Sequence, residues 1–275
     1  MIRLLAIDMD GTCLTSRKRI TDSTLSALSD AAAQGVEIVP TTGRVLTCLP
    51  HQLADCTFYR YVISSNGARV TDVRTGETLH ACLMPRDRAL GILSACDGPG
   101  VGLTAHVDNE FLLQGHALAA MGRMVYGQDA NRARTVPSLS ALLSAEHTGV
   151  EELQLFFLRR GARPRVKAAL ADFPECSLSF GGRYVEICGS GATKGAALAM
   201  LAAKLGIARE DIACIGDSDN DLTMFDSAGL RFAVGNAVPA LKDRADIVLP
   251  DNDHDGVALA IRHHLLSGGR PDNQA

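Results

Sequence analysis

The most constraining feature of this 275-residue chain is an alternation of strand and helix patterns that stops near residue 83 and returns near residue 189. In the first block, short aliphatic runs indicate buried strands, and capped amphipathic runs indicate helices. The expected elements are strands 2–8, 36–40 and 61–64 and helices 22–34 and 44–54. Asn66-Gly67 is a hairpin signal, from which we predict that 68–71 pairs with 77–80. Strands that alternate with helices predict a parallel sheet with right-handed crossovers.

The middle of the chain follows a different pattern. Its expected elements are helices 85–96, 138–145 and 162–171 and strands 103–107, 110–114, 151–158, 176–180 and 183–188. Residues 115–136 carry no readable pattern. Several of these strands alternate or pair locally, which favours an antiparallel sheet backed by helices. The middle block therefore predicts an inserted α+β domain.

The first pattern then returns. Its expected elements are helices 194–205, 238–243 and 255–266, a helix ending near 227, and strands 211–215, 231–234 and 246–249. The polar tail 268–275 is expected to be disordered. We therefore predict an α/β fold: residues 1–82 and 188–275 form a discontinuous core with a Rossmann-like parallel sheet, and 83–187 form the inserted α+β domain.

The composition argues against several classes of function. A net charge of −4 does not favour a nucleic-acid partner. No apolar run reaches the ~18 residues that a membrane span needs, so no membrane partner is expected. The chain enters its first strand at once, without the pattern of a signal peptide. The eight cysteines show no C-x-x-C spacing, which favours reduced thiols and a cytoplasmic location.

Four polar clusters follow predicted core strands or begin core helices: Asp8/Asp10, Thr42/Gly43, Lys194 and Asp217/Asn220/Asp221. The carboxyl ends of parallel strands share one edge of a sheet, so these clusters are expected to converge. Converging carboxylates repel one another unless a cation lies between them. Mg²⁺ suits such oxygen ligands and a bound phosphate, and hydroxyl, N–H and ammonium groups suit the phosphate oxygens.

Each cluster also has a structural explanation. Asp8 and Asp10 could simply favour a turn before Gly11. Thr42 could cap the helix that follows it, a role compatible with phosphate binding. Lys194 at a helix start opposes the helix dipole, which favours a functional reason for it.

The clusters, in this order, resemble the motifs of the haloacid dehalogenase superfamily of phosphatases. The matching segments are Asp8-x-Asp10-Gly11-Thr12, Thr42-Gly43-Arg44, Lys194-Gly195 and Gly216-Asp217-Ser218-x-Asn220-Asp221. The insertion is similar to the C2-type cap of the Cof-type branch, subfamily IIB. Ser65-Asn66-Gly67-Ala68, Val185-Glu186-Ile187 and Asp255-Gly256-Val257-Ala258 also resemble that branch.

The resemblance implies roles for the acidic residues and the lysine. Asp8 would be the nucleophile, and Asp10 would protonate the leaving oxygen and then activate water. Mg²⁺ would be bound by the Asp8 carboxylate, the Asp10 carbonyl oxygen and Asp217, with Asp221 supporting that shell. Lys194 would neutralise charge on Asp8 and on the phosphoryl group.

The resemblance also implies the phosphate contacts: Thr42, Gly43, Asn220, Lys194 and the N–H of Met9. Thr41 stands where relatives more often have Ala; Thr42 takes the role because it directly precedes Gly43. Because the cap of the family closes over the active site, the candidate substrate contacts are Arg44, Asn66, Arg183 and Tyr184. Glu186 lies near the second crossing between cap and core and is a candidate brace.

The function implied is that of a Mg²⁺-dependent phosphatase acting through an aspartyl-phosphate on a small phosphorylated metabolite, with a sugar phosphate favoured. One alternative is a phosphotransferase or phosphomutase on the same scaffold, which would pass the phosphoryl group to a hydroxyl. A second is a non-catalytic sensor of phosphorylated metabolites, although a sensor would not need Asp10. A receiver-type signalling domain would need neither Asp10 nor the cap.

Overall fold

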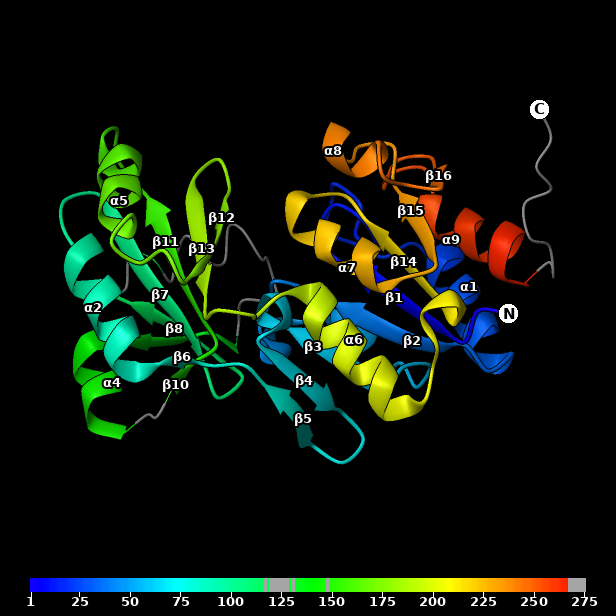
Figure 1. Ribbon diagram of the computed structural model, residues 1–275, viewed down its shortest axis with the longest axis horizontal. Helices are drawn as coiled ribbons and strands as arrows, with labels where there is room; N and C mark the ends of the chain where they lie inside the picture. The colour runs from blue at the N-terminus through cyan, green and yellow to red at the C-terminus, as the bar shows by residue number, and fades with distance from the viewer. Residues whose placement is uncertain (116–117, 119–128, 130–131, 147–148, 267–275) are drawn as a thin grey trace.

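The computed structural model describes residues 1–115, 118, 129, 132–146 and 149–266, and its strands form two large sheets that lie beside each other along the long axis (Figure 1). The first sheet has eight strands in the order β16-β15-β14-β1-β2-β3-β4-β5. Strands β16 to β3 run parallel, and β3, β4 and β5 pair antiparallel. The bounds are β1 Leu4–Asp8, β2 Glu37–Thr41, β3 Tyr61–Ser64, β4 Arg69–Asp72, β5 Glu77–Ala81, β14 Ile212–Gly216, β15 Leu230–Ala233 and β16 Ile247–Val248.

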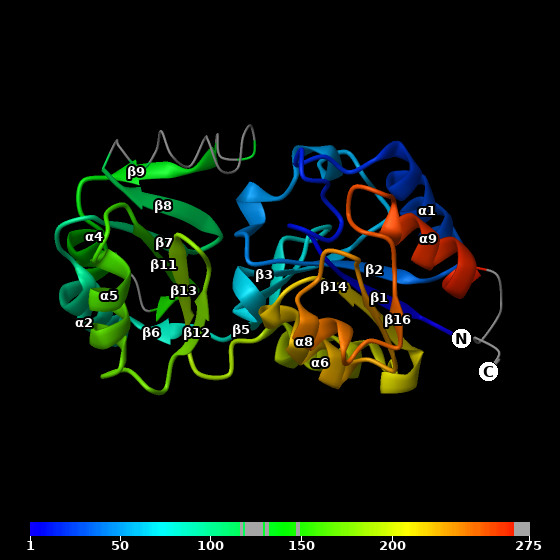
Figure 2. The ribbon, with the colours of Figure 1, turned by 90° about the horizontal axis from the view of Figure 1, so that it is seen from above.

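Helices cover both faces of this first sheet. They are α1 Asp22–Ala33, α6 Lys194–Leu205, α7 Leu222–Ser227, α8 Pro239–Lys242 and α9 Gly256–Ala260, which continues into a π-helical turn at Ile261–Leu266. Helices α1 and α9 lie on one face and α6 on the other (Figure 2). Coverage on both faces explains why β1 reads as an unbroken aliphatic run, since all five of its residues are buried.

The second sheet has six strands in the order β12-β13-β11-β7-β8-β9, antiparallel except for the β8–β9 pair. Its strands are β7 Val101–Val107, β8 Glu110–Gln114, β9 Arg134–Val136, β11 Glu152–Phe157, β12 Ser177–Phe180 and β13 Tyr184–Cys188. Helices α2 Arg86–Cys96, α4 Leu139–Glu146 and α5 Ala162–Leu170 cover the face turned away from the first sheet (Figures 1 and 2). The other face is therefore turned toward the first sheet. A short pair joins β6 Met84–Pro85 to β10 Gly149–Val150.

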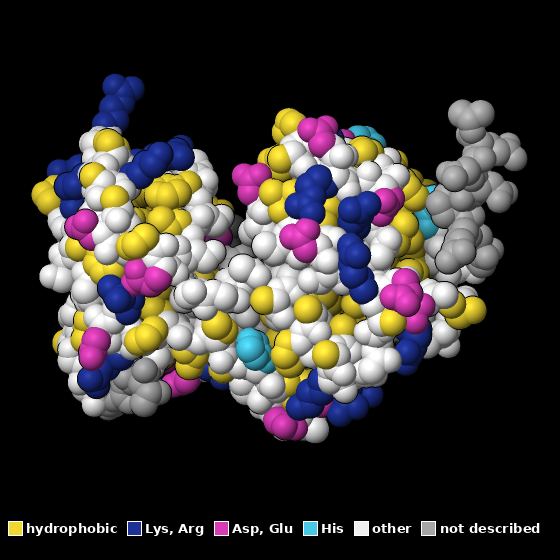
Figure 3. Space-filling model, viewed as in Figure 1, with side chains coloured by type: hydrophobic (Ala, Val, Ile, Leu, Met, Phe, Trp, Pro, Cys, Tyr) yellow, Lys and Arg dark blue, Asp and Glu magenta, His cyan; other side chains and the backbone are white. Residues whose placement is uncertain are grey.

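The chain crosses from the first sheet to the second between β5 and β6 and returns between β13 and α6. The two crossings pack against each other, because Cys82 of the first contacts a small buried cluster of Ala68, Cys188 and Ala192. In the space-filling view a notch separates the two lobes above this connection (Figure 3). No helix in the described ranges is long and apolar enough to cross a bilayer.

The predicted fold class, a Rossmann-like α/β core with an added α+β sheet, is confirmed. The predicted helix 44–54 is wrong: the segment forms two 3₁₀ turns, Leu46–Cys48 and His51–Leu53. Pro50 is the cause, because it has no N–H to donate and keeps Leu49 in an extended conformation.

The predicted pairing of 68–71 with 77–80 is confirmed as β4–β5, but the Asn66-Gly67 turn joins β3 to β4 instead. The tail 268–275 and most of 115–136 lie outside the described residues.

Candidate active site

The polar clusters meet at the carboxyl edge of the first sheet. Strand β1 lies between β2 and β14, and all three run in the same direction. Asp8 is the last residue of β1 and is in register with Thr41, the last residue of β2. Asp217 directly follows β14. Parallel pairing therefore delivers Asp8, Thr42 and Asp217 to one edge, where open α/β sheets bind their ligands.

Lys194 lies at the centre of the site. Its Nζ is 2.6 Å from Oδ1 of Asp8 and 2.7 Å from Oδ1 of Asp221, and its side chain is 1% exposed. It is the first residue of α6, after Thr193, whose side chain accepts a hydrogen bond from the N–H of Ala196. The two carboxylates offset both the helix dipole and the loss of water around the ammonium. Burial alone would lower the pKa of Lys194, but Asp221 and Asp8 raise it above its usual value.

Asp221 shapes the turn that follows β14. Its Oδ2 accepts hydrogen bonds from the N–H groups of Asp217, at 2.9 Å, and Ser218, at 3.1 Å. On the other side of Asp217, Gly11 has φ +88°, and a Cβ at that position would lie 2.4 Å from Oδ2 of Asp217. A glycine is therefore required where the chain leaves β1, because the backbone passes against the Asp217 carboxylate.

The carboxylates destabilise one another in their charged forms. The pKa of Asp8 is raised well above its usual value, chiefly by burial and further by Asp221 and Asp217, although Lys194 counteracts this. Burial, with Asp221, likewise raises the pKa of Asp217 to about 6. Oδ2 of Asp8 is buried and accepts no hydrogen bond from the described residues. Asp8, Asp217 and Asp221 each offer an oxygen atom within 4.8 Å of the others, and this oxygen-only donor set fits a hard cation such as Mg²⁺.

Asp10 lies beside the cluster but binds different partners. Arg44 donates to it through Nε at 2.6 Å and Nη2 at 2.9 Å, and Lys18 donates through Nζ at 2.9 Å. Burial alone would raise the pKa of Asp10, but Arg44 and Lys18 together lower it to about 2. Arg44 also donates to Asp129 at 2.8 Å, an ion pair that sequence reasoning missed. Arg44 and Lys18 therefore favour the ionised form of Asp10 in this arrangement.

Of the candidate phosphate-binding residues, Thr42, Gly43 and Asn220 line the same cavity as Asp8. Oγ1 of Thr42 accepts a hydrogen bond from the N–H of Arg44 at 3.0 Å, so this residue does shape the local turn. The side chain of Met9 is buried in the core, which leaves only its backbone for a ligand. Asn220 donates through Nδ2 to Oδ1 of Asn66 at 3.0 Å. Gly43 lies against the same amide, since a Cβ there would be 3.1 Å from Nδ2 of Asn66.

Asn66 connects the core to two carboxylates of the second sheet. Its Nδ2 donates to Oε2 of Glu152 at 2.8 Å and to Oε2 of Glu186 at 3.0 Å. Its backbone is left-handed, with φ 54°, in the turn Ser65–Gly67 that joins β3 to β4. The amide is thus fully occupied by protein groups in this arrangement. Sequence reasoning missed Glu152; the signal was a charged pair, Glu151-Glu152, that is buried at the start of a mainly apolar strand.

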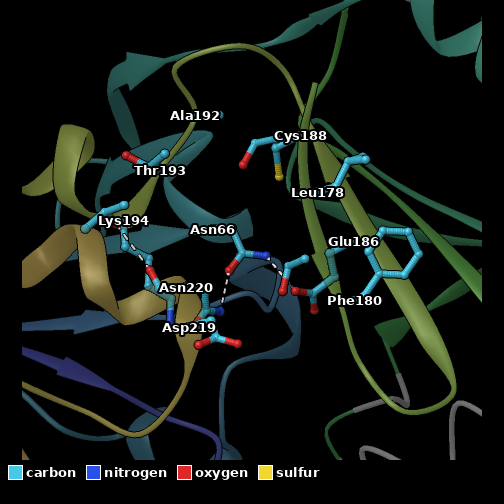
Figure 4. Close-up of a pocket in the computed structure, with 13 residues that line it drawn as sticks. Asn66, Leu178, Phe180, Glu186, Cys188, Ala192, Thr193, Lys194, Asp219 and Asn220 are labelled. Atoms are coloured by element: carbon cyan, nitrogen blue, oxygen red, sulfur yellow. Dashed lines mark hydrogen bonds between the residues drawn. The ribbon is translucent and has the colours of Figure 1, made fainter. Parts of the chain in front are cut away.

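Two adjoining cavities open over the site. One, of about 340 Å³, is lined by Asp8, Asp10, Thr42, Gly43, Arg44 and Tyr184, among others. The other, of about 310 Å³, is lined by Asn66, Lys194 and Asn220 on the core side and by residues of β12 and β13 on the opposite side (Figure 4). Both are lined by Ser179, Phe180, Glu186, Asp219 and Asn220. Arg183 is exposed and lines neither of these two cavities, so the structure does not bring this candidate substrate contact to the site.

Comparison with known proteins gives one consistent result. Residues 5–261 match the sequence profile of haloacid dehalogenase-like hydrolases. The pyridoxal phosphate phosphatase YbhA of Escherichia coli is 29% identical, over 96% of this chain and 99% of that protein. A solved haloacid dehalogenase-like hydrolase from B. subtilis superposes with a TM-score of 0.85 at 27% identity, covering 96% of this chain and 100% of that one. A solved sugar phosphatase of subclass IIB has a TM-score of 0.81 at 24% identity, covering 95% and 98%.

Proposed function

This chain belongs to the haloacid dehalogenase-like hydrolases, in their Cof-type branch (subfamily IIB), and we propose that it is a Mg²⁺-dependent phosphatase that works through an aspartyl-phosphate. The family acts on small phosphorylated metabolites, and we propose a sugar phosphate as the favoured kind of substrate. One observation carries the proposal. Lys194 binds Oδ1 of Asp8, while Oδ2 of Asp8 has no donor among the residues that the structure describes, so one carboxylate oxygen is neutralised and the other is available to react.

Asp8 is the proposed nucleophile. Its Oδ2 forms a bond to phosphorus as the ester P–O bond on the opposite side breaks. Lys194 stabilises the carboxylate before attack and the phosphoryl oxygens afterwards. Because the lysine is also held by Asp221, it stays in position when Asp8 becomes covalently modified.

Asp10 is the proposed acid and base. It first gives a proton to the departing oxygen, and then takes one from the water whose oxygen attacks phosphorus and releases Asp8. The low pKa that Arg44 and Lys18 give Asp10 favours the ionised form, which is the form needed for the second step. Donation in the first step requires that Asp10 leave its contact with Arg44 and take up a proton from water before it gives that proton to the leaving oxygen.

The phosphate and the metal complete the proposed site. The hydroxyl of Thr42, the N–H groups of Met9 and Gly43, and the amide of Asn220 would bind the phosphate oxygens. Asp8, Asp217 and the carbonyl oxygen of Asp10 would hold Mg²⁺, with Asp221 fixing the turn that carries Asp217. The bound cation would neutralise charge on the carboxylates and the transferring group.

The two lobes suggest why the substrate is small. We propose residues 1–82 and 188–275 as the catalytic core and 83–187 as the cap, since the catalytic carboxylates lie at the core edge that the cap sheet faces. A cavity of about 340 Å³ is of the size that holds a small metabolite. The eight free cysteines support the proposal of a cytoplasmic enzyme, where thiols stay reduced.

The test is release of inorganic phosphate from a panel of phosphorylated sugars, nucleotides and cofactors, with Mg²⁺ and without an added acceptor. We expect phosphate release by the wild type and none by Asp8→Asn, while Asp55→Asn, at an exposed aspartate, serves as the matched control. Substantial activity in Asp8→Asn would exclude the nucleophile assignment. Transfer to a second alcohol without free phosphate would indicate a phosphotransferase, and binding without turnover would indicate a sensor.

A further inference from the structure

The cap side of the two cavities has a distinctive composition. Its lining residues are Phe156, Ser177, Leu178, Ser179, Phe180, Gly181, Tyr184 and Glu186. Three of these are aromatic, in a chain with only eight Phe, four Tyr and no Trp. Within the described part of the chain, Glu186 is the single charged residue among them. The cap therefore offers a substrate apolar ring surfaces and one carboxylate.

Glu186 is held so that its carboxylate faces the cavities. It lies on β13, and its Oε2 accepts from Asn66 at 3.0 Å while its Oε1 accepts a long bond from Gln154 at 3.3 Å. Figure 4 shows it pointing from the cap strands toward Asn66 and Asn220 of the core. Because Glu186 lines both cavities, a substrate in either one meets it.

The neighbouring Glu152 is the less favourable place for a negative charge in this carboxylate pair. Its side chain is 0% exposed, and burial, followed by the charge of Glu186, raises its pKa well above the usual value. Burial also raises the pKa of Glu186, but Asn66 and Lys194 act in the opposite direction. Both oxygens of the more accessible Glu186 accept from amide N–H groups, whereas Oε1 of Glu152 has no donor among the described residues, so we assign the negative charge of the pair to Glu186.

The cations that line the cavities do not balance this charge. Lys18 pairs with Asp10, Arg44 pairs with Asp10 and Asp129, and Lys194 pairs with Asp8 and Asp221. All three are thus already paired with carboxylates of the protein. The part of the site that receives the leaving group is negative, and in a low-dielectric cavity a second negative charge on the substrate would be repelled there.

We propose that Glu186 is a specificity-determining residue that selects phosphate monoesters whose leaving group is a ring with a hydroxyl or ammonium donor, and that it rejects leaving groups with a second negative charge. This inference rests on the proposed phosphatase function and adds the substrate class. Phe180 and Tyr184 supply the apolar surface for the ring, and the Glu186 carboxylate accepts from its donor. Repulsion of the wrong charge is as effective a source of specificity as attraction of the right group.

The test uses three substrates that differ only in charge: phenyl phosphates with 4-hydroxymethyl, 4-aminomethyl or 4-carboxy substituents. Each substrate is compared with itself in the wild type and in Glu186→Gln, so its intrinsic reactivity cancels. In Glu186→Gln we expect kcat/KM for the carboxy compound to rise, relative to the aminomethyl compound, by about tenfold or more. If Glu186 only supported the structure and did not recognise the substrate, Glu186→Gln would lower kcat/KM equally for all three compounds. That result would overturn the proposal.

Matched variants isolate the charge at this position. Glu186→Asp keeps the charge and should retain the wild-type order of kcat/KM among the three substrates. This second variant keeps the proposal testable if Glu186→Gln does not fold. Glu175→Gln removes a carboxylate elsewhere in the cap, where it pairs with Arg88, and should not change the order. A tenfold change in Asp219→Asn but not in Glu186→Gln would assign discrimination to the core and overturn the proposal. If the wild type released no phosphate from any compound, the proposed function itself would fail, a result distinct from turnover without discrimination.

Discussion

Replacement of Lys194 by methionine tests the electrostatic core of the site. The ammonium lies 2.6 Å from Asp8 and 2.7 Å from Asp221, and it is fully buried. Coulomb's law with an effective dielectric constant of about 20 gives roughly 6 kcal/mol for each contact. The cost of removing the ammonium from water returns much of this gain, so removal of one partner from a buried ion pair costs about 3–5 kcal/mol. We expect a loss of that size in the free energy of unfolding, measured in a metal chelator.

The loss should depend on pH in a defined direction. Lys194 lowers the pKa values of Asp8 and Asp217, so without it both rise further above their values in the unfolded chain. The folded variant then binds more protons than the unfolded one, and its stability falls as the pH rises. The difference in the free energy of unfolding between wild type and variant should therefore widen from pH 5.5 to pH 8. The expected slope is about 1.4 kcal/mol per pH unit for each extra proton that the folded variant binds.

The assay is urea unfolding followed by circular dichroism, because the chain has no tryptophan to report by fluorescence. Lys204→Met is the matched control, since it makes the same change at an exposed position of the same helix and should cost less than about 0.5 kcal/mol. The reasoning is refuted if Lys194→Met is as stable as the wild type in chelator, or if the gap narrows as the pH rises.

Three further predictions concern the metal, a buried histidine and a turn. Chelation should abolish phosphate release, and Mg²⁺ at about 100 times its Kd should raise the free energy of unfolding by about 2.7 kcal/mol; full activity in chelator contradicts the metal site. Burial lowers the pKa of His106 to about 3, so the unfolded chain, with its pKa near 6.5, takes up the proton first as the pH falls. From pH 7.5 to 5.5 the wild type should lose about 1.4 kcal/mol relative to His106→Gln in urea titrations, and an unchanged difference would count against this burial effect. Gly67 and Gly35 both have positive φ, but a Cβ at Gly67 would lie 2.1 Å from the carbonyl oxygen of Thr193, whereas none lies near Gly35. Gly67→Ala should therefore cost roughly 2–4 kcal/mol and Gly35→Ala about 1 kcal/mol; equal losses would show that the close approach is irrelevant.

The arrangement of the core could be predicted because it depends on local pattern and on the geometry of parallel sheets. Aliphatic runs identify β1 and β14, and polar residues at their ends must meet once the strands are parallel. A local conflict explains the wrong helix at 44–54, where the signal of Pro50 outweighs the helical pattern around it. Such conflicts can be read in the sequence if proline is given its full weight.

The contacts between core and cap could not be predicted in the same way. Arg44 binds Asp129 and Asn66 binds Glu152, and each pair joins residues about 85 positions apart through the docking of two sheets. No periodicity encodes that docking. Asn66 was a candidate for substrate contact, yet its amide is occupied by Glu152, Glu186 and Asn220. A sequence motif can identify an important residue without showing which partner it binds.

The pairing of β1 with β14 has a consequence for synthesis of the protein. Leu4 is paired with Ile212, so one edge of β1 has no partner strand until the residues between them, including 83–187, have been translated. At about 5–20 residues per second this interval is roughly 10–40 s, during which the aliphatic edge of β1 has no neighbour on that side. The cap strands from β7 to β13 are complete before β14 emerges from the ribosome. The proposed cap is therefore available to fold before the core site that it faces, and the cluster of Asp8, Lys194 and Asp221 cannot assemble in a nascent chain until most of the chain has been made.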